Sequence, residues 1–178
     1  MRKDIFTRVL KDHRNRIYSH ALRCLRDPDD AADVTQEAFL RLWRRGPDIE
    51  EDRLAAWLTR VTHNLCIDHA RRTRTVHTYF GTPDIEAANS LAAAPEPESF
   101  PETDQQRALL DALETLPPET RSILLMHYFQ GLKLREIAST LDMNLNSVKV
   151  RVHRARKTLR LILDDVSSTP STAKWMTG

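Results

Sequence analysis

The residues best suited to chemistry in this sequence are arginines and lysines gathered in two segments. Residues 53–74 contain five arginines and one acid, Asp68. Residues 149–160 contain six lysines or arginines and no acid. Guanidinium and ammonium groups bind phosphates, and the amide of Asn64 can read a base edge. For the first segment, a solvated basic face is the usual explanation of a single charged helix, and a nucleic-acid surface is the alternative. The second segment lacks the acids of an ordinary solvated helix, so we predict that it binds DNA.

The sequence gives little indication of nucleotide binding or catalysis. The four glycines lie too far apart for a glycine-rich phosphate loop, and no Ser/His/Asp set or pair of carboxylates has a spacing that indicates catalysis. We therefore expect a protein that is not an enzyme and that needs no cofactor.

His63, Cys66 and His69 resemble a metal-binding cluster in the linear sequence. On a helix, however, these three residues spread over about a third of the wheel, and the sequence offers no fourth ligand. No metal site is predicted. Cys24 and Cys66 would form a redox pair only if their helices packed together, and packed thiols without a redox role are the simpler interpretation.

Composition predicts an all-α, soluble protein of the cytoplasm. Glycines and β-branched clusters are few, whereas Leu, Ala, Arg and Glu are common. No run reaches the roughly 18 apolar residues of a membrane span, and the N-terminal residues lack the apolar core of a signal peptide. Two cysteines are too few for a disulfide scaffold.

Charge and proline content divide the chain into two small helical domains. Residues 75–106 contain six acids and no lysine or arginine, and four prolines fall within this stretch. Such a composition predicts a flexible acidic linker at 79–104. The linker would join an N-terminal bundle of three to four helices at 1–78 to a C-terminal domain at 105–165, with a disordered tail at 166–178.

The N-terminal domain reads as helices near 4–26, 30–44 and 53–74. An apolar stripe along the second helix is predicted to be core, and it comprises Ala31, Val34, Ala38, Phe39 and Leu42. The opposite face is polar, with Leu40 in its middle. Leu40 is either a lone exposed leucine or a hot spot on a partner-binding face, and the helical wheel favours neither.

The third helix is expected to bury Leu54, Trp57, Leu58, Val61 and Leu65. Its outer face is expected to expose the candidate DNA contacts Arg60, His63, Asn64, Ile67, Arg71 and Arg74.

The C-terminal domain reads as helices near 104–116, 119–128, 134–141 and 147–163. A short helix, a tight turn and a longer basic helix indicate a helix-turn-helix. Ser147, Val150, Arg151 and Arg154 share an outward face near the start of the long helix, where a recognition helix meets base edges.

Three motifs resemble the bacterial RNA polymerase sigma factors. Asp30-Ala-Ala-Asp33-Val-Thr-Gln36-Glu37-Ala-Phe39-Leu40-Arg-Leu-Trp43 is similar to the family's core-binding helix. Trp57-Leu-Thr-Arg-Val-Thr-His-Asn64-Leu-Cys-Ile-Asp68-His-Ala-Arg71-Arg72 resembles the segment that contacts the −10 element. Leu116-Pro-Pro-Glu-Thr-Arg121 and Ser147-Val-Lys149-Val-Arg151-Val-His-Arg154-Ala-Arg156 resemble sigma domain 4. Two such domains with only a linker between them are the layout of the extracytoplasmic-function type of the sigma-70 family.

The resemblance implies a role for each surface. Core polymerase would be bound through its β′ clamp helices by Asp33, Gln36, Glu37 and Leu40, and its β flap would be a second contact. The outer face of the third helix would bind the melted −10 strand, with Asn64 lining a pocket for a flipped base. The −35 element would be read by Ser147, Lys149, Val150, Arg151 and Arg154, with Arg156 and Lys157 on phosphates. An anti-sigma factor is a further candidate partner, and no membrane insertion is expected.

Two other functions remain compatible with the residues. A sigma-like decoy that sequesters an anti-sigma factor would keep the shape without needing basic DNA faces. A helix-turn-helix regulator that binds duplex DNA without polymerase would make the pattern around Gln36 and Glu37 a coincidence.

Overall fold

The computed structural model describes residues 3–45, 49–80 and 104–168, and all the regular structure within them is helical. The predicted all-α fold is confirmed for this part of the chain. The linker predicted at 79–104 and the tail predicted at 166–178 lie almost entirely outside the described residues.

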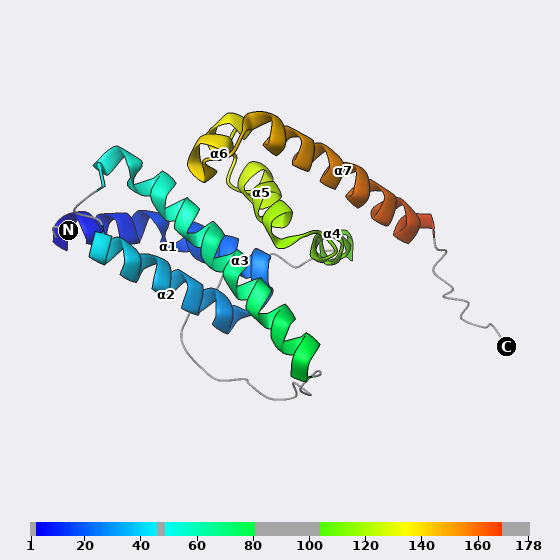
Figure 1. Cartoon of the computed structure of the whole chain (residues 1–178), viewed down its shortest axis with the longest axis horizontal. Helices are drawn as coiled ribbons and strands as arrows, with labels where there is room; N and C mark the ends of the chain where they lie inside the picture. Colours follow the sequence, from blue (N-terminus) through cyan, green and yellow to red (C-terminus); the bar gives the residue numbers. More distant parts are fainter. Residues whose placement is uncertain (1–2, 46–48, 81–103, 169–178) are drawn as a thin grey trace.

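Helices α1, α2 and α3 form an N-terminal unit in which each helix packs against the other two (Figure 1). Their bounds, with a short 3₁₀ helix before the third, are α1 (Lys3–Leu25), α2 (Pro28–Arg45), η2 (Glu51–Arg53) and α3 (Leu54–Phe80). Asp27 caps α2 by accepting a hydrogen bond from the Asp30 amide at 2.9 Å. The last helix continues six residues past its predicted end, because the first helix-breaking residues after it are Gly81 and Pro83.

Helices α4 to α7 form a C-terminal unit that contains the predicted helix-turn-helix. Their bounds are α4 (Asp104–Glu114), α5 (Pro118–Tyr128), α6 (Leu134–Leu141) and α7 (Leu145–Ser168). Gly131 ends the turn after α5 with φ +70°, and Asp142 ends α6 in the left-handed region at φ 56°. Asn144 accepts a hydrogen bond from the Asn146 amide at 2.8 Å, so α7 begins two residues before its predicted start.

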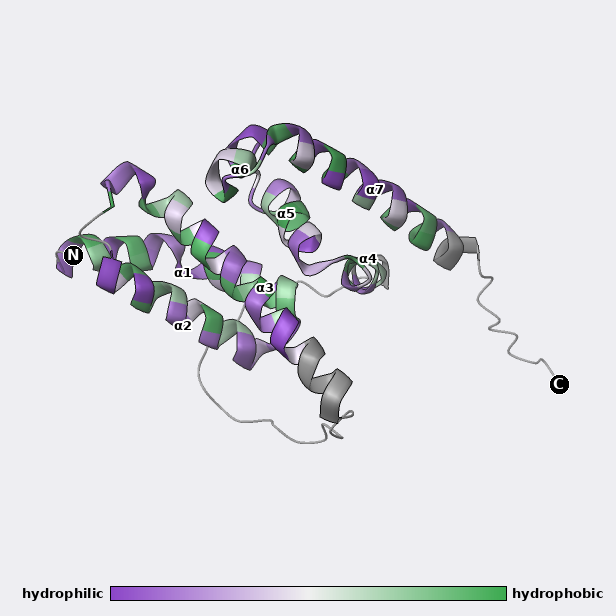
Figure 2. Cartoon of the chain, in the orientation of Figure 1, coloured by the Kyte–Doolittle hydropathy of each residue, from purple (hydrophilic) through white to green (hydrophobic). Residues whose placement is uncertain are grey.

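Amphipathic periodicity explains how these helices pack. Every residue of the apolar stripe predicted for α2 is buried. In α7 the stripe of Val148, Val152 and Ala155 is buried in the same way. Figure 2 shows these apolar positions recurring between hydrophilic ones along both helices.

The two units are packed against each other, and α5 lies in the contact between them. This helix touches both α1 and α3, and buried residues of both units join in one apolar cluster (Figure 1). We call this packing the closed arrangement. It places the C-terminal unit over one face of α3.

Candidate nucleic-acid and partner interface

The outer face of α2 presents an apolar side chain among polar ones. Asp33 and Gln36 are exposed, and Leu40 is 40% exposed. Glu37 is half-buried and accepts a hydrogen bond from Arg41 Nε at 2.7 Å. The structure therefore places all four predicted core-polymerase contacts on one side of the helix.

A hollow of about 620 Å³ lies between α2 and α3, and two of the predicted −10 residues line it. These are Arg60 and Asn64, both exposed. Three further arginines, Arg41, Arg44 and Arg45, line the same hollow together with Trp57. Several guanidinium groups beside an indole ring can hold phosphate and stack on a base.

Sequence reasoning did not assign Arg41, Arg44 and Arg45 to the nucleic-acid surface. Their signal is present in the sequence as three arginines near the C-terminal end of α2. It becomes a site only because α2 packs against α3 and brings these arginines next to Arg60.

The expectation that His63 and Ile67 lie on an exposed face is wrong for the closed arrangement. Both side chains are only 6% exposed. The Nδ1 atom of His63 is 2.7 Å from the Ser122 hydroxyl of α5, so the C-terminal unit covers this part of α3. Burial, followed by the electrostatic effect of His20, lowers the pKa of His63 to about 4. At neutral pH this ring carries no charge.

The Arg71 side chain is exposed, but it already forms an ion pair. Its Nη2 atom donates to Glu119 Oε1 of α5 at 2.6 Å. A backbone hydrogen bond, followed by this contact with Arg71, lowers the pKa of Glu119. The side chain of Arg74, the last predicted −10 contact, lies outside the described residues.

The N-terminal half of α7 presents the predicted recognition face. Ser147, Arg151 and Arg154 are exposed, and Val150 is 46% exposed. Lys149 is exposed as well. No acid occurs between Asp142 and Asp164, so this surface is positive along its length.

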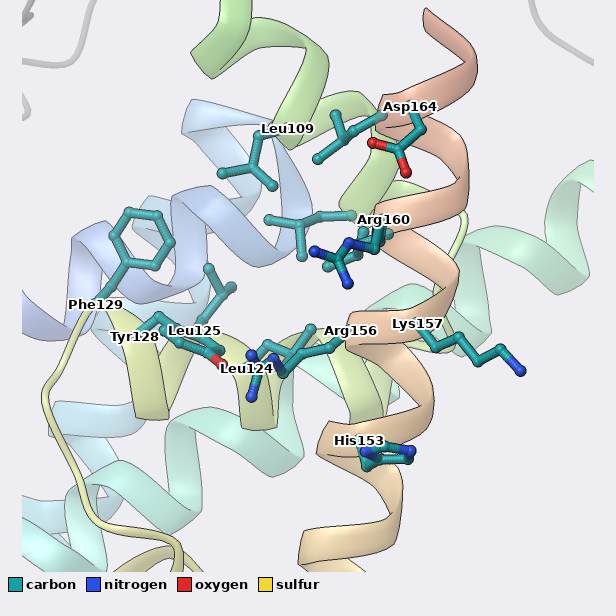
Figure 3. Close-up of a pocket in the computed structure, with 13 residues that line it drawn as sticks. Leu109, Leu124, Leu125, Tyr128, Phe129, His153, Arg156, Lys157, Arg160 and Asp164 are labelled. Carbon is teal, nitrogen blue, oxygen red and sulfur yellow. The ribbon is translucent and has the colours of Figure 1, made fainter. Parts of the chain in front are cut away.

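Arg156 and Lys157 are exposed farther along α7 and line a different feature. They border a groove of about 880 Å³ between α7 and helices α4 and α5, and leucines, Tyr128 and Phe129 also line it. Figure 3 shows Arg156 reaching from α7 toward the groove, while Lys157 points away from it. Arg156 is nine residues from Ser147 and therefore lies on the opposite side of the helix.

Polar contacts of α4 and α5 with the N-terminal unit hold the closed arrangement together. Arg121 donates to the Cys24 carbonyl at 2.7 Å. Arg26 pairs with Asp111 at 2.5 Å and with Glu114 at 3.2 Å. The guanidinium of Arg23 lies 4.7 Å from the centre of the Phe129 ring.

The two cysteines meet where α1 and α3 pack together. Both are buried, and no disulfide joins them. With His20 they form a group whose ligand atoms all lie within 4.8 Å of one another. His69, the third member of the linear cluster, instead pairs with Asp30 at 3.1 Å.

None of the helices in the described ranges is long and apolar enough to cross a lipid bilayer.

Both units match known protein families. Residues 9–76 match the sigma-70 region 2 family and residues 106–159 match sigma-70, region 4. The chain is 34% identical over 90% of its length to an ECF RNA polymerase sigma factor, SigE, of Mycolicibacterium smegmatis, and it spans 62% of that protein. It is 27% identical to the RNA polymerase sigma factor SigV of Bacillus subtilis, with 90% of this chain and 92% of that protein covered.

The solved sigma factor RpoE of Bartonella quintana, in complex with the anti-sigma factor NepR, has a similar fold. Its TM-score is 0.69 at 24% identity, over 89% of this chain and 96% of that one. The two matched regions, in this order and on these helices, show that the chain belongs to the sigma-70 family of RNA polymerase sigma factors, in its extracytoplasmic-function type.

Proposed function

We propose that this protein binds core RNA polymerase and directs transcription from promoters whose −35 and −10 elements it recognises. One observation carries the proposal: a basic recognition helix and an arginine-lined hollow occur in the same chain, on α7 and between α2 and α3. A duplex-binding regulator needs the first surface but not the second. A sequestering decoy needs neither.

Core polymerase is assigned to the exposed face of α2. Leu40 stands among Asp33, Gln36 and Glu37, which is the pattern of an apolar anchor ringed by polar groups. We assign this face to the β′ clamp helices.

The −10 strand is assigned to the hollow between α2 and α3. Arg60 and the three arginines of α2 would hold its backbone, and Asn64 would contact a base turned out of the stack. Capture of that base offsets the few kcal/mol that unstacking costs, so no nucleotide hydrolysis is needed and the protein acts by binding alone.

The −35 duplex is assigned to the N-terminal half of α7. Ser147, Arg151 and Arg154 would meet base edges in the major groove, with Lys149 on the backbone. Val150 offers an apolar contact for a thymine methyl group.

Promoter binding requires the closed arrangement to open. His63 and Ile67 are covered by α5, and Arg71 is held by Glu119. If these three residues also contact the −10 strand, the C-terminal unit must move away from α3 first.

The groove between α4, α5 and α7 is assigned to the β flap of the polymerase. Its apolar lining accepts a nonpolar side chain, and its basic border from α7 favours an acidic partner segment. An anti-sigma factor that covered this groove would compete with polymerase. All these partners place the protein's action in the cytoplasm.

The test is transcription in run-off format with purified protein, sigma-free core polymerase and genomic DNA, followed by sequencing of RNA 5′ ends. Discrete start sites that share upstream motifs at −35 and −10 are the expected result. A known sigma factor with the same core preparation serves as the positive control.

Absence of both specific starts and core association, with the control active, would overturn the proposal. Duplex binding in that case would identify a polymerase-independent regulator. Failure to bind either DNA or core would identify the decoy.

A further inference from the structure

Three side chains with metal-binding atoms converge at the inner surface of the N-terminal unit. His20 and Cys24 are one turn apart on α1, and the ligand atom of Cys66 on α3 lies within 4.8 Å of both of theirs. All three are buried, with at most 6% of each residue exposed. An imidazole and two thiols are ligand types that zinc prefers.

The distances fit a single small ion. Zn–S bonds of about 2.3 Å and Zn–N bonds of about 2.0–2.1 Å give a tetrahedron whose edges are roughly 3.3–3.8 Å. The His20 Nε2 and Cys24 Sγ atoms are already 3.6 Å apart. The Cys66 sulfur lies within 4.8 Å of both.

The Ser122 hydroxyl of α5 lies beside this set. It is 3.0 Å from His20 Nε2 and 2.7 Å from His63 Nδ1, so it contacts both rings. An ion bound by His20, Cys24 and Cys66 would replace the hydroxyl as the partner of His20 Nε2. Its fourth position would take a water molecule, as in zinc sites with three protein ligands.

We propose that His20, Cys24 and Cys66 form a binding site for one Zn²⁺ ion between α1 and α3. Binding would release the thiol protons to solvent and tie α1 to α3. The site differs from the linear cluster of His63, Cys66 and His69, since His69 is engaged by Asp30.

The test uses the full chain, reduced with a phosphine and freed of metal, and titrated with Co²⁺ as a spectroscopic probe. We expect one ion per chain, with sulfur-to-cobalt charge transfer and the visible bands of tetrahedral Co²⁺, both removed by added Zn²⁺. The chain has only two cysteines, so a thiolate signal in the wild type must come from Cys24 and Cys66. This readout decides the proposal even if a substituted chain fails to fold.

Variants then identify the ligands. Cys24→Ser and His20→Gln should each weaken binding by more than the about 10- to 100-fold that loss of an outer-shell partner costs. His69→Gln, on the same helix as Cys66, should bind normally. Ser122→Ala should bind at least as tightly as the wild type, because it removes the hydroxyl that now occupies His20 Nε2.

A second readout is thermal stability. Zn²⁺ should raise the melting temperature of the wild type and of His69→Gln but not that of Cys66→Ser. Absence of saturable Co²⁺ binding, a spectrum without thiolate charge transfer, or equal loss of binding in His69→Gln would overturn the proposal.

Discussion

Leu40 is an apolar side chain on a polar surface, and it is one of few large apolar residues that the described chain exposes. If it is an anchor for core polymerase, Leu40→Ala should weaken core binding by about 1–2 kcal/mol, or roughly tenfold, without changing helicity. Equilibrium binding to labelled core polymerase and circular dichroism measure the two effects.

Leu161→Ala is the matched control, since this leucine is 64% exposed on α7, away from the α2 face. It should leave core affinity unchanged. Equal affinities of Leu40→Ala and the wild type would remove Leu40 from the interface.

Arg154 lies on the exposed face of α7 where direct contact with bases is expected. A guanidinium that donates two hydrogen bonds to a guanine contributes about 1–3 kcal/mol of discrimination. Arg154→Ala should therefore lose that amount on the −35 duplex but much less on a scrambled duplex, in fluorescence anisotropy. The same loss on both duplexes would show that Arg154 contacts phosphate only.

His63 and Asn64 show what residue patterns can and cannot predict. Both were expected on the outer face of the third helix, and Asn64 is indeed exposed. His63 is buried because α5, about 60 positions away in the chain, covers it. A helical wheel contains no information about such a distant contact. For the same reason it could not show that Cys24 and Cys66 meet.

At the scale of elements, local sequence determines most of what is seen. The caps at Asp27 and Asn144, the breaks at Gly131 and Asp142, and the apolar stripes are all short-range features. They made the helix-turn-helix and the buried side of α2 predictable. The hollow between α2 and α3 was not predictable, because it depends on how two helices pack.

That hollow leads to a prediction about strand opening. Asn64→Ala should reduce open-complex formation by roughly tenfold while closed-duplex binding stays near normal, because only an unstacked base reaches the hollow. Permanganate footprinting reports the open complex. Asn15→Ala, an exposed asparagine on α1, is the control. Normal opening in Asn64→Ala would exclude Asn64 from the base pocket.

At the scale of the whole molecule, the two units cover part of each other. Glu119 of α5 forms an ion pair with Arg71. A phosphate group of DNA would bind Arg71 in the same way. Glu119→Gln should favour the open form, but only by up to about 1 kcal/mol or roughly fivefold, because the Arg71 side chain of the pair is largely exposed. Small-angle scattering should show a larger radius of gyration, and promoter affinity should rise.

Glu51→Gln is the matched control for this change. Glu51 pairs with Arg8 inside the N-terminal unit, so its loss breaks an ion pair without freeing α5. If the two variants have the same scattering and the same promoter affinity, the Arg71–Glu119 pair does not restrain the closed arrangement.

The ion pairs between the units also have a consequence for ionic strength. Added salt weakens protein–phosphate contacts. It also screens the ion pairs of Arg26 with Asp111 and of Arg71 with Glu119, which oppose opening of the closed arrangement. An arginine that exchanges a carboxylate for a phosphate releases fewer counterions than one that was free in solution. Promoter affinity should therefore decline less steeply with salt in the wild type than in Glu119→Gln. The closed arrangement would in this way make promoter binding less sensitive to changes in the salt content of the cell.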